Sequence, residues 1–251
     1  MNYNWNWGIF FDLTPYGDGT YLGMLLNGLC WTLATAALAA IIALALGIVV
    51  GTLRTLPGIW PQRFANAYIE LFRNIPLLVQ FFLWFFVVPE LLPETWGSWL
   101  KALPNAAFWT AVVCLGFYHS IRVAIILSSG INAQPRGQKL AGYALGFTLP
   151  QTYCYVLLPM AFRLSLPPLG NECLSIVKNT AVALTIGLVE LTASARAMSE
   201  FSFQVFEAFT AATVIYLLVN VFALLLMQLL EKRTAVPGYI TGANVASGKS
   251  M

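Results

Sequence analysis

Hydrophobic residues along this chain gather into long runs that are interrupted at only a few charged positions. A helix needs about 20 mostly apolar residues to cross the hydrocarbon core of a bilayer. The runs that reach this length predict five transmembrane helices, at about residues 24–53, 64–88, 106–129, 167–191 and 208–230. The pattern therefore predicts an all-α integral membrane protein.

Two of these segments carry extra signals. Within residues 24–53, Gly47 and Gly51 form an i, i+4 pair of small residues that favours close packing of another helix. Residues 167–191 contain Glu172 and Lys178 in their interior, so hydropathy supports this span less strongly. Because proline is tolerated in the first turn of a helix, the proline pair at 167–168 is expected to mark the start of this span.

Lys and Arg predict the topology, because cytoplasmic loops of membrane proteins collect basic residues. Eight of them stand on one side of the predicted spans and two on the other: Arg54, Arg63, Arg136, Lys139, Arg163, Lys232, Arg233 and Lys249 against Lys101 and Arg196. This bias places the N-terminus outside and the C-terminus in the cytoplasm. Residues 1–20 would form a periplasmic segment, 21–233 the transmembrane domain and 234–251 a flexible cytoplasmic tail.

The composition agrees with a membrane protein. Of the 251 residues, 59% are hydrophobic and 9% charged, where a soluble domain carries about 25% charged residues. This excludes a soluble enzyme, and the net charge of +3 is too small and scattered for a nucleic-acid binder. The start of the chain lacks a basic region and has Asp12 and Asp18 before its first apolar run, so we expect no cleavable signal peptide.

Few residues could carry catalytic or metal chemistry. The four cysteines have no CxxC spacing and are interpreted as buried, reduced residues. The single histidine, His119, has no second imidazole to share a metal with, and we interpret it as a polar group hydrogen-bonded within the bundle. We therefore expect no metal site, and because no GxxxxGK[ST] loop for a nucleotide is present, we also expect no bound cofactor. Any ATP would bind a partner chain, and a membrane-embedded enzyme is disfavoured.

Glu70 and Arg73 are expected at the cytoplasmic lip of span 64–88 and Glu190 at the outer end of span 167–191. This leaves three charged residues well inside the predicted spans, namely Arg122, Glu172 and Lys178. Each costs at least about 2.5–3.5 kcal/mol in a membrane helix, so it needs a partner or a task. Two readings stay open. Glu172 could pair with Lys178 or Arg122 in a structural cluster, or the two cations could meet the carboxylates of an anionic substrate.

A long cytoplasmic loop, at about residues 130–163, is too organised for a simple linker. Pro135 can open a short helix and Gly146 can close it. Gly142 and Gly146 give this helix a stripe of small residues, which would let another backbone come close. The helix could dock on a cytoplasmic partner or lie on the lipid headgroups.

The same loop resembles the EAA loop of ATP-binding-cassette (ABC) importer permeases. The resemblance rests on Gly137-Gln138, Ala141, Gly146 and Val156-Leu157-Leu158-Pro159. Leu140-Ala141-Gly142 stands where Glu-Ala-Ala is usual. The resemblance implies a short coupling helix that contacts an ATPase, with coupling residues Gly137, Gln138, Ala141, Gly142, Gly146, Leu158 and Pro159.

Two further segments narrow the resemblance to permeases for polar amino acids. Residues 68–80, with Arg73 and Pro76, resemble their second helix, and residues 171–191, with Asn179 and Thr180, resemble their fourth. Arg73 is also explained by the positive-inside tendency, or by gating at the bend before Pro76. Residues 4–10 and 88–94 are similar to one permease subunit of glutamate/aspartate importers.

The resemblance implies a multi-pass permease of the bacterial inner membrane with the type I ABC importer fold. It would import polar amino acids, glutamate and aspartate first, by alternating access. Its implied partners are a second, related permease chain, two copies of a cytoplasmic ATPase and a periplasmic solute-binding protein. The alternatives are a permease for another polar amino acid, such as glutamine or arginine, and an ion-gradient-driven transporter or channel.

Overall fold

The computed structural model describes residues 3–15, 17 and 19–234, and within these ranges it is helical with no β-strand. Leu13 and Thr20 form an isolated β-bridge before the first long helix. Apart from Thr234, which ends the last helix, the predicted tail lies outside the described residues.

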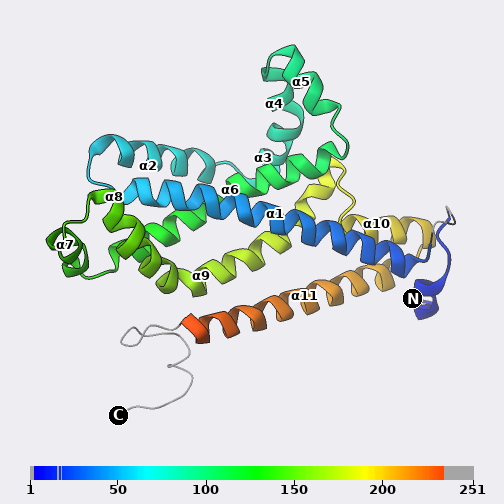
Figure 1. Cartoon of the computed structure of the whole chain (residues 1–251). Coiled ribbons are helices and arrows are strands. Elements are labelled where there is room, and N and C mark those ends of the chain that lie inside the picture. The colour runs from blue at the N-terminus through cyan, green and yellow to red at the C-terminus, as the bar shows by residue number, and fades with distance from the viewer. Residues whose placement is uncertain (1–2, 16, 18, 235–251) are drawn as a thin grey trace, which may run out of the picture.

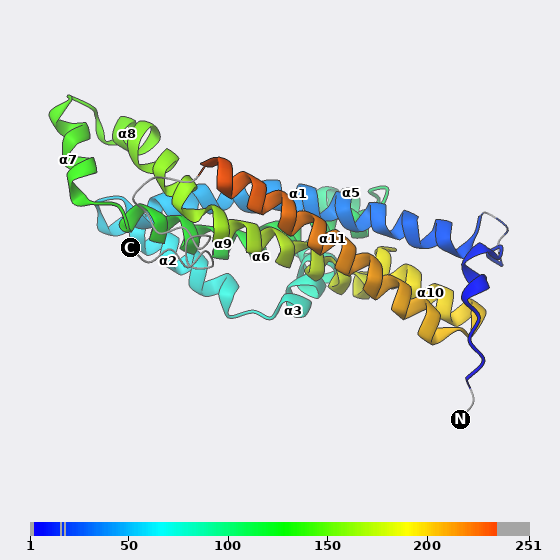
Figure 2. The ribbon, with the colours of Figure 1, turned by 90° about the horizontal axis from the view of Figure 1, so that it is seen from below.

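The long helices run along one axis (Figures 1 and 2), and the segment of residues 77–101 projects away from it in Figure 1. The N-terminal segment and α10 (Leu191–Ser202) lie at one end of this axis, and α7 (Arg136–Ala144) and α8 (Leu149–Thr152) lie at the other. The α-helices of the described ranges are α1 (Tyr21–Thr55), α2 (Ile59–Arg73), α3 (Leu77–Phe82), α4 (Val88–Leu91), α5 (Glu94–Lys101), α6 (Ala106–Asn132), α7 (Arg136–Ala144), α8 (Leu149–Thr152), α9 (Leu158–Asn179), α10 (Leu191–Ser202) and α11 (Val205–Thr234). Short 3-10 or π segments lie at Trp7–Phe11, Leu83–Val87, Tyr153–Leu157 and Thr180–Ile186.

Three described helices, α1, α6 and α11, are long and apolar enough to cross a membrane as single rods. Two further spans are possible if each of two bent pairs is counted as one. Residues 59–73 and 77–91 meet at 97°, and residues 149–186 and 191–202 meet at 51°. Counted in this way, the described residues contain five possible spans, which is the number predicted from the sequence.

The central packing is that of α1 against α6, the most extensive helix pair of the described chain. A side chain at Gly47 would collide with Val123, and a Cβ at Gly51 would lie 2.8 Å from the backbone oxygen of Ala124. Gly116 of α6 is equally close to Ile42 of α1. The prediction that Gly47 and Gly51 allow another helix to approach closely is confirmed.

The predicted second span, 64–88, is wrong as one continuous helix. The chain bends between α2 and α3, where Pro76 disfavours a helical conformation of the residue before it. The buried amide of Gln80 donates to the carbonyl oxygens of Phe72 (2.8 Å) and Ile75 (3.1 Å). This side chain replaces backbone hydrogen bonds that the bend removes.

The predicted fourth span, 167–191, is wrong at both ends. Its helical path begins at Leu149, where Thr148 and Gln151 form a capping box, so the proline pair lies inside α9. The path ends at Ile186, followed by Gly187 with a φ of +89°, which terminates the helix. The cytoplasmic connection predicted at 130–163 is correspondingly shorter, because residues 149–163 already belong to this helical path.

Candidate functional site

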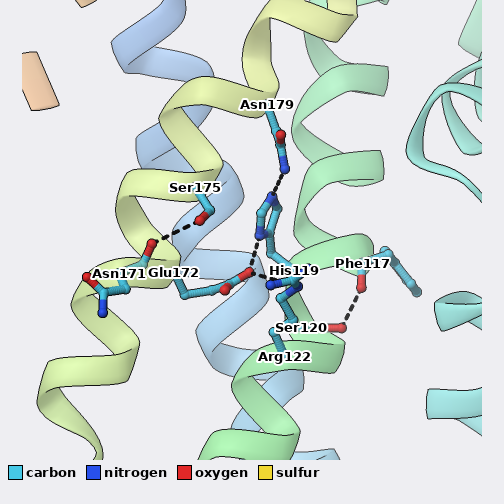
Figure 3. A network of polar contacts seen from close by, with 8 residues as sticks. All are labelled: Phe117, His119, Ser120, Arg122, Asn171, Glu172, Ser175 and Asn179. Atoms are coloured by element: carbon cyan, nitrogen blue, oxygen red, sulfur yellow. Dashed lines mark hydrogen bonds and ion pairs between the residues drawn. The ribbon is translucent and has the colours of Figure 1, made fainter. Parts of the chain in front are cut away.

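A polar cluster joins the middle of α6 to the C-terminal half of α9 (Figure 3). Glu172 and Asn179 are seven residues apart, so both lie on the same face of α9. His119 of α6 lies between them. Its Nδ1 is 2.5 Å from Glu172 Oε1, and its Nε2 is 3.1 Å from Asn179 Nδ2.

The hydrogen-bond roles follow from the Asn179 amide. The NH2 group of Asn179 can only donate, so His119 Nε2 accepts, and Nδ1 carries the hydrogen that is donated to Glu172. The side chain of His119 is 1% exposed and that of Glu172 is 7% exposed. A buried carboxylate needs such a partner, because desolvation costs several kcal/mol per ion.

Arg122 lies one turn along α6 from His119 and approaches the same carboxylate oxygen. Its Nε is 3.9 Å from Glu172 Oε1, while its side chain is 62% exposed. This is the only ion pair of Arg122 with described residues, and no described residue accepts a hydrogen bond from it. The guanidinium is therefore anchored loosely on one side and open on the other.

The structure brings together two of the three ionisable residues predicted for the substrate path. Arg122 and Glu172 are in contact, whereas Lys178 is exposed in the last turn of α9 and has no ion-pair partner among the described residues. His119 was interpreted only as a structural histidine, and its contacts place it at the centre of the cluster. Asn179, known from the sequence only as a family signature, is part of the same cluster.

The other signature residues lie apart from this cluster. Arg73 is the exposed last residue of α2, and Pro76 precedes the first turn of α3. Thr180 is fully buried and its hydroxyl donates to the carbonyl oxygen of Val177 (2.8 Å). Arg73 and Pro76 thus flank the bend between α2 and α3, and Thr180 stabilises the end of α9.

The helix predicted in the cytoplasmic loop is present as α7, at the end of the molecule opposite the N-terminus (Figure 2). Gly142 is buried, and a Cβ there would lie 2.9 Å from Thr152 of α8. The prediction that Gly142 belongs to a small-residue surface for a partner is therefore wrong, because Gly142 packs against Thr152 of its own chain. Gly146 has a φ of +80° and ends the helix.

The remaining predicted coupling residues are spread over the outer side of this region. Gly137 and Ala141 are exposed on α7, and Gln138 is half-buried there. Leu158 is half-buried and Pro159 exposed at the start of α9. The exposed side of α7 also presents Leu140 (64% exposed), which leaves an apolar surface outside the bundle.

The sequence profile of a family described as "Binding-protein-dependent transport system inner membrane component" matches residues 43–236. This stretch includes the α6–α9 cluster and α7. The chain belongs to this family. It is accordingly a multi-pass permease component of the inner membrane.

Individual relatives are permeases for amino acids. The chain is 45% identical over 245 residues to the glutamate/aspartate import permease protein GltJ of Escherichia coli K12, covering 96% of this chain and 100% of the relative. It is 30% identical over 213 residues to the glutamine transport system permease protein GlnP of E. coli K12, covering 85% and 94%. The expected membership of the amino-acid ABC permeases is confirmed.

A solved structure supports the same fold. The crystal structure of an amino acid ABC transporter with histidines superimposes with a TM-score of 0.71 at 30% identity, covering 85% of this chain and 95% of that one. The predicted all-α membrane fold of the type I ABC importer permeases is confirmed.

Proposed function

We propose that this chain is the permease subunit of an ATP-driven importer for glutamate and aspartate. The similarity to the glutamate/aspartate permease extends over 96% of the chain, whereas the glutamine permease is less similar and matches a shorter part. A binding protein outside delivers the amino acid, and a second permease chain completes the path. Two ATPase copies in the cytoplasm hydrolyse ATP and act through α7.

The residue that we propose to bind substrate is Arg122, because its guanidinium contacts Glu172 on one side and is exposed on the other. α6 is otherwise largely covered by its neighbours, so an exposed guanidinium on it needs an aqueous path or a partner chain. Its planar fork can bind a carboxylate through two parallel hydrogen bonds. Glutamate and aspartate each bring two carboxylates, and Arg122 meets one of them.

Glu172 sets how tightly Arg122 holds that carboxylate. His119 fixes the position of the Glu172 carboxylate, which lies 3.9 Å from Arg122 and offsets its charge before substrate arrives. An arriving carboxylate competes with Glu172 for the guanidinium. This competition lets the substrate leave again, since a fully unpaired arginine would hold it for too long.

Substitution of Arg122 tests this role in the transporter co-purified with its partners and reconstituted with the binding protein. Arg122→Lys keeps the charge and loses the fork, so glutamate uptake should fall about 10-fold, the equivalent of about one charge-assisted hydrogen bond. Arg63→Lys is the matched control, since Arg63 is an exposed arginine on α2 outside the cluster. Wild-type uptake by Arg122→Lys and Arg122→Ala, both correctly inserted, would contradict the role of Arg122.

The substrate itself is tested by ATP hydrolysis stimulated by the loaded binding protein over a panel of amino acids. Glutamate and aspartate should stimulate hydrolysis and glutamine should not. Stimulation by glutamine alone would refute the substrate and leave the permease assignment in place. Uptake without ATP, driven by an ion gradient, would refute the ATP-driven mechanism.

A further inference from the structure

The His119 ring lies between a carboxylate and an amide, and this pair of partners suits both its neutral and its protonated form (Figure 3). Its Nδ1–H donates to Glu172, so the free lone pair is on Nε2, 3.1 Å from the NH2 group of Asn179. The Asn179 amide makes no other hydrogen bond with described residues. A half-turn of this amide replaces its NH2 group by its oxygen, which accepts from a protonated Nε2.

Arg122 links this proton site to the substrate. Its Nε is 3.9 Å from Glu172 Oε1, the same oxygen that accepts from His119. A substrate carboxylate that binds Arg122 brings a second negative charge beside the buried Glu172. Two carboxylates that share a site oppose each other's charge, which favours a proton on a group between them or in contact with them. Binding of the substrate therefore favours a proton on the His119 ring.

Other titratable groups on the two helices of the cluster cannot answer the new charge in this way. On α6, the Tyr118 ring lies edge-on to the His119 ring, with 5.2 Å between the centroids. On α9, Cys173 follows Glu172, and Lys178 is exposed with no ion-pair partner among the described residues. A phenol or a thiol gains no positive charge, and lysine already carries one, whereas a neutral imidazole becomes positive when it takes up a proton.

The other elements packed against α6 bring no charge to the cluster. α1 has no charged residue before Arg54 near its end, and α3 and the segments 83–87 and 180–186 have none. α2 meets α6 at Ser120, whose hydroxyl lies 2.8 Å from that of Tyr68 and which is turned about 100° around the helix from His119. The charged residues of α2 are exposed, namely Arg63, Glu70 and Arg73. The charges of Glu172, Arg122 and the substrate therefore govern the proton on His119.

We propose that binding of a substrate carboxylate at Arg122 is accompanied by uptake of one proton at Nε2 of His119, with the Asn179 amide turning to accept it. This inference rests on the proposed function, because Arg122 must hold the carboxylate. The proton comes from the water of the substrate path and returns to it when the substrate leaves. Glutamate and the proton together are neutral, which lowers the cost of holding an anion within the membrane. By linkage, the site binds acidic amino acids more tightly as the pH falls.

Isothermal titration calorimetry of glutamate into the co-purified transporter, without its binding protein, tests the proton directly. Titrations in phosphate and in Tris, whose ionisation enthalpies differ, give the number of protons exchanged at pH 6, 7 and 8. Uptake should reach about one proton per glutamate, and binding should tighten about fivefold from pH 8 to pH 6. Binding without proton exchange would overturn the inference and leave the substrate site in place. No binding by the wild type, or unchanged binding by Arg122→Ala, would overturn the substrate site and the inference together.

His119→Gln identifies the residue that holds the proton. Its amide has one donor and one acceptor, as the neutral imidazole has, but it takes up no proton at neutral pH. This variant should bind glutamate with no proton uptake and with the same affinity at pH 6 and pH 8. Proton uptake as in the wild type would place the proton on Glu172 or elsewhere and overturn the inference.

Asn179→Leu tests the turning amide, because it leaves a protonated Nε2 without an acceptor. An unpaired charged donor costs more than an unpaired neutral acceptor, so proton uptake at pH 7 should fall to less than about half of the wild-type value. Uptake as in the wild type would overturn the role of Asn179. Arg63→Gln is the control, since it removes an exposed charge on α2 outside the cluster, and it should keep the wild-type proton count. An equal loss in Arg63→Gln would overturn the assignment to this cluster.

Discussion

Replacement of Gly51 by alanine tests the close crossing of α1 and α6. The new Cβ would lie 2.8 Å from the backbone oxygen of Ala124 and 3.2 Å from its Cα. Both contacts are with backbone atoms, so no change of rotamer relieves them. α6 would have to retreat by about 0.5 Å to restore an ordinary C···O separation of about 3.3 Å.

The cost of this shift follows from the packing that it disturbs. A gap of about 0.5 Å forfeits a quarter or more of the dispersion energy of each affected contact, and overpacking of this kind costs about 1–3 kcal/mol. Alanine gains about 0.5–1 kcal/mol over glycine within a helix. The net expectation for Gly51→Ala is a loss of about 1–2 kcal/mol in the free energy of unfolding.

Gly23→Ala is the matched control, because it is the same change in the same helix. A Cβ at Gly23 would lie 3.5 Å from Thr20 Oγ1, an ordinary contact, so this variant should gain stability or stay unchanged. The measurement is reversible unfolding in mixed micelles by titration with sodium dodecyl sulfate. Equal stability of the Gly51→Ala and Gly23→Ala proteins would refute the close crossing.

Three further predictions concern contacts seen elsewhere in the structure. Glu172→Leu leaves the His119 Nδ1–H without an acceptor and should cost about 1–3 kcal/mol in the same titration, whereas Glu172→Gln keeps an acceptor and should cost less; equal losses would contradict the hydrogen bond. Gly146→Ala should cost about 1–2 kcal/mol because an L-residue is strained at a φ of +80°, and no loss would contradict that backbone conformation. Burial, followed by the hydrogen bond to Glu207, raises the pKa of the Tyr3 hydroxyl above its ordinary value of 10. Because the pKa of Tyr3 is raised in the folded protein, its contact with Glu207 stabilises the N-terminal segment fully below pH 10. This stabilisation is lost as the pH rises through the pKa of Tyr3 in the folded protein. Limited proteolysis of the segment should therefore increase at alkaline pH in the wild type and at every pH in Tyr3→Phe.

The parts of the fold that follow local rules could be predicted from the sequence. A charge-free run of apolar residues crosses the bilayer whatever surrounds it, so the prediction for residues 24–53 agrees with α1 to within three residues at each end. The small-residue pair at Gly47 and Gly51 is equally local, because it only requires that some helix approach that face.

The start of the fourth span could not be predicted in this way. Both the proline pair at 167–168 and the segment from Thr148 to Gln151 carry signals for a helix start. Hydropathy favours the first because it measures only the apolar part of a helix. The actual helix continues beyond the apolar stretch to the capping box, and a single sequence gives no measure of how far a span extends past the membrane.

The polar cluster was only partly accessible from the sequence. Helical geometry turns the chain about 100° per residue, so Lys178, six residues after Glu172, points about 120° away from it, while Asn179, seven residues after, returns to within about 20°. This spacing alone favours Asn179 over Lys178 as a companion of Glu172. His119 lies 53 residues from Glu172, on another helix. The contact depends on how far α6 is rotated about its axis, and the close crossing with α1, which includes Gly116 and the backbone of Ser120, helps to set that rotation. The same packing that Gly51→Ala would disturb therefore also positions His119 against Glu172, so a variant that separates α1 from α6 should impair uptake through the Arg122 site as well as stability.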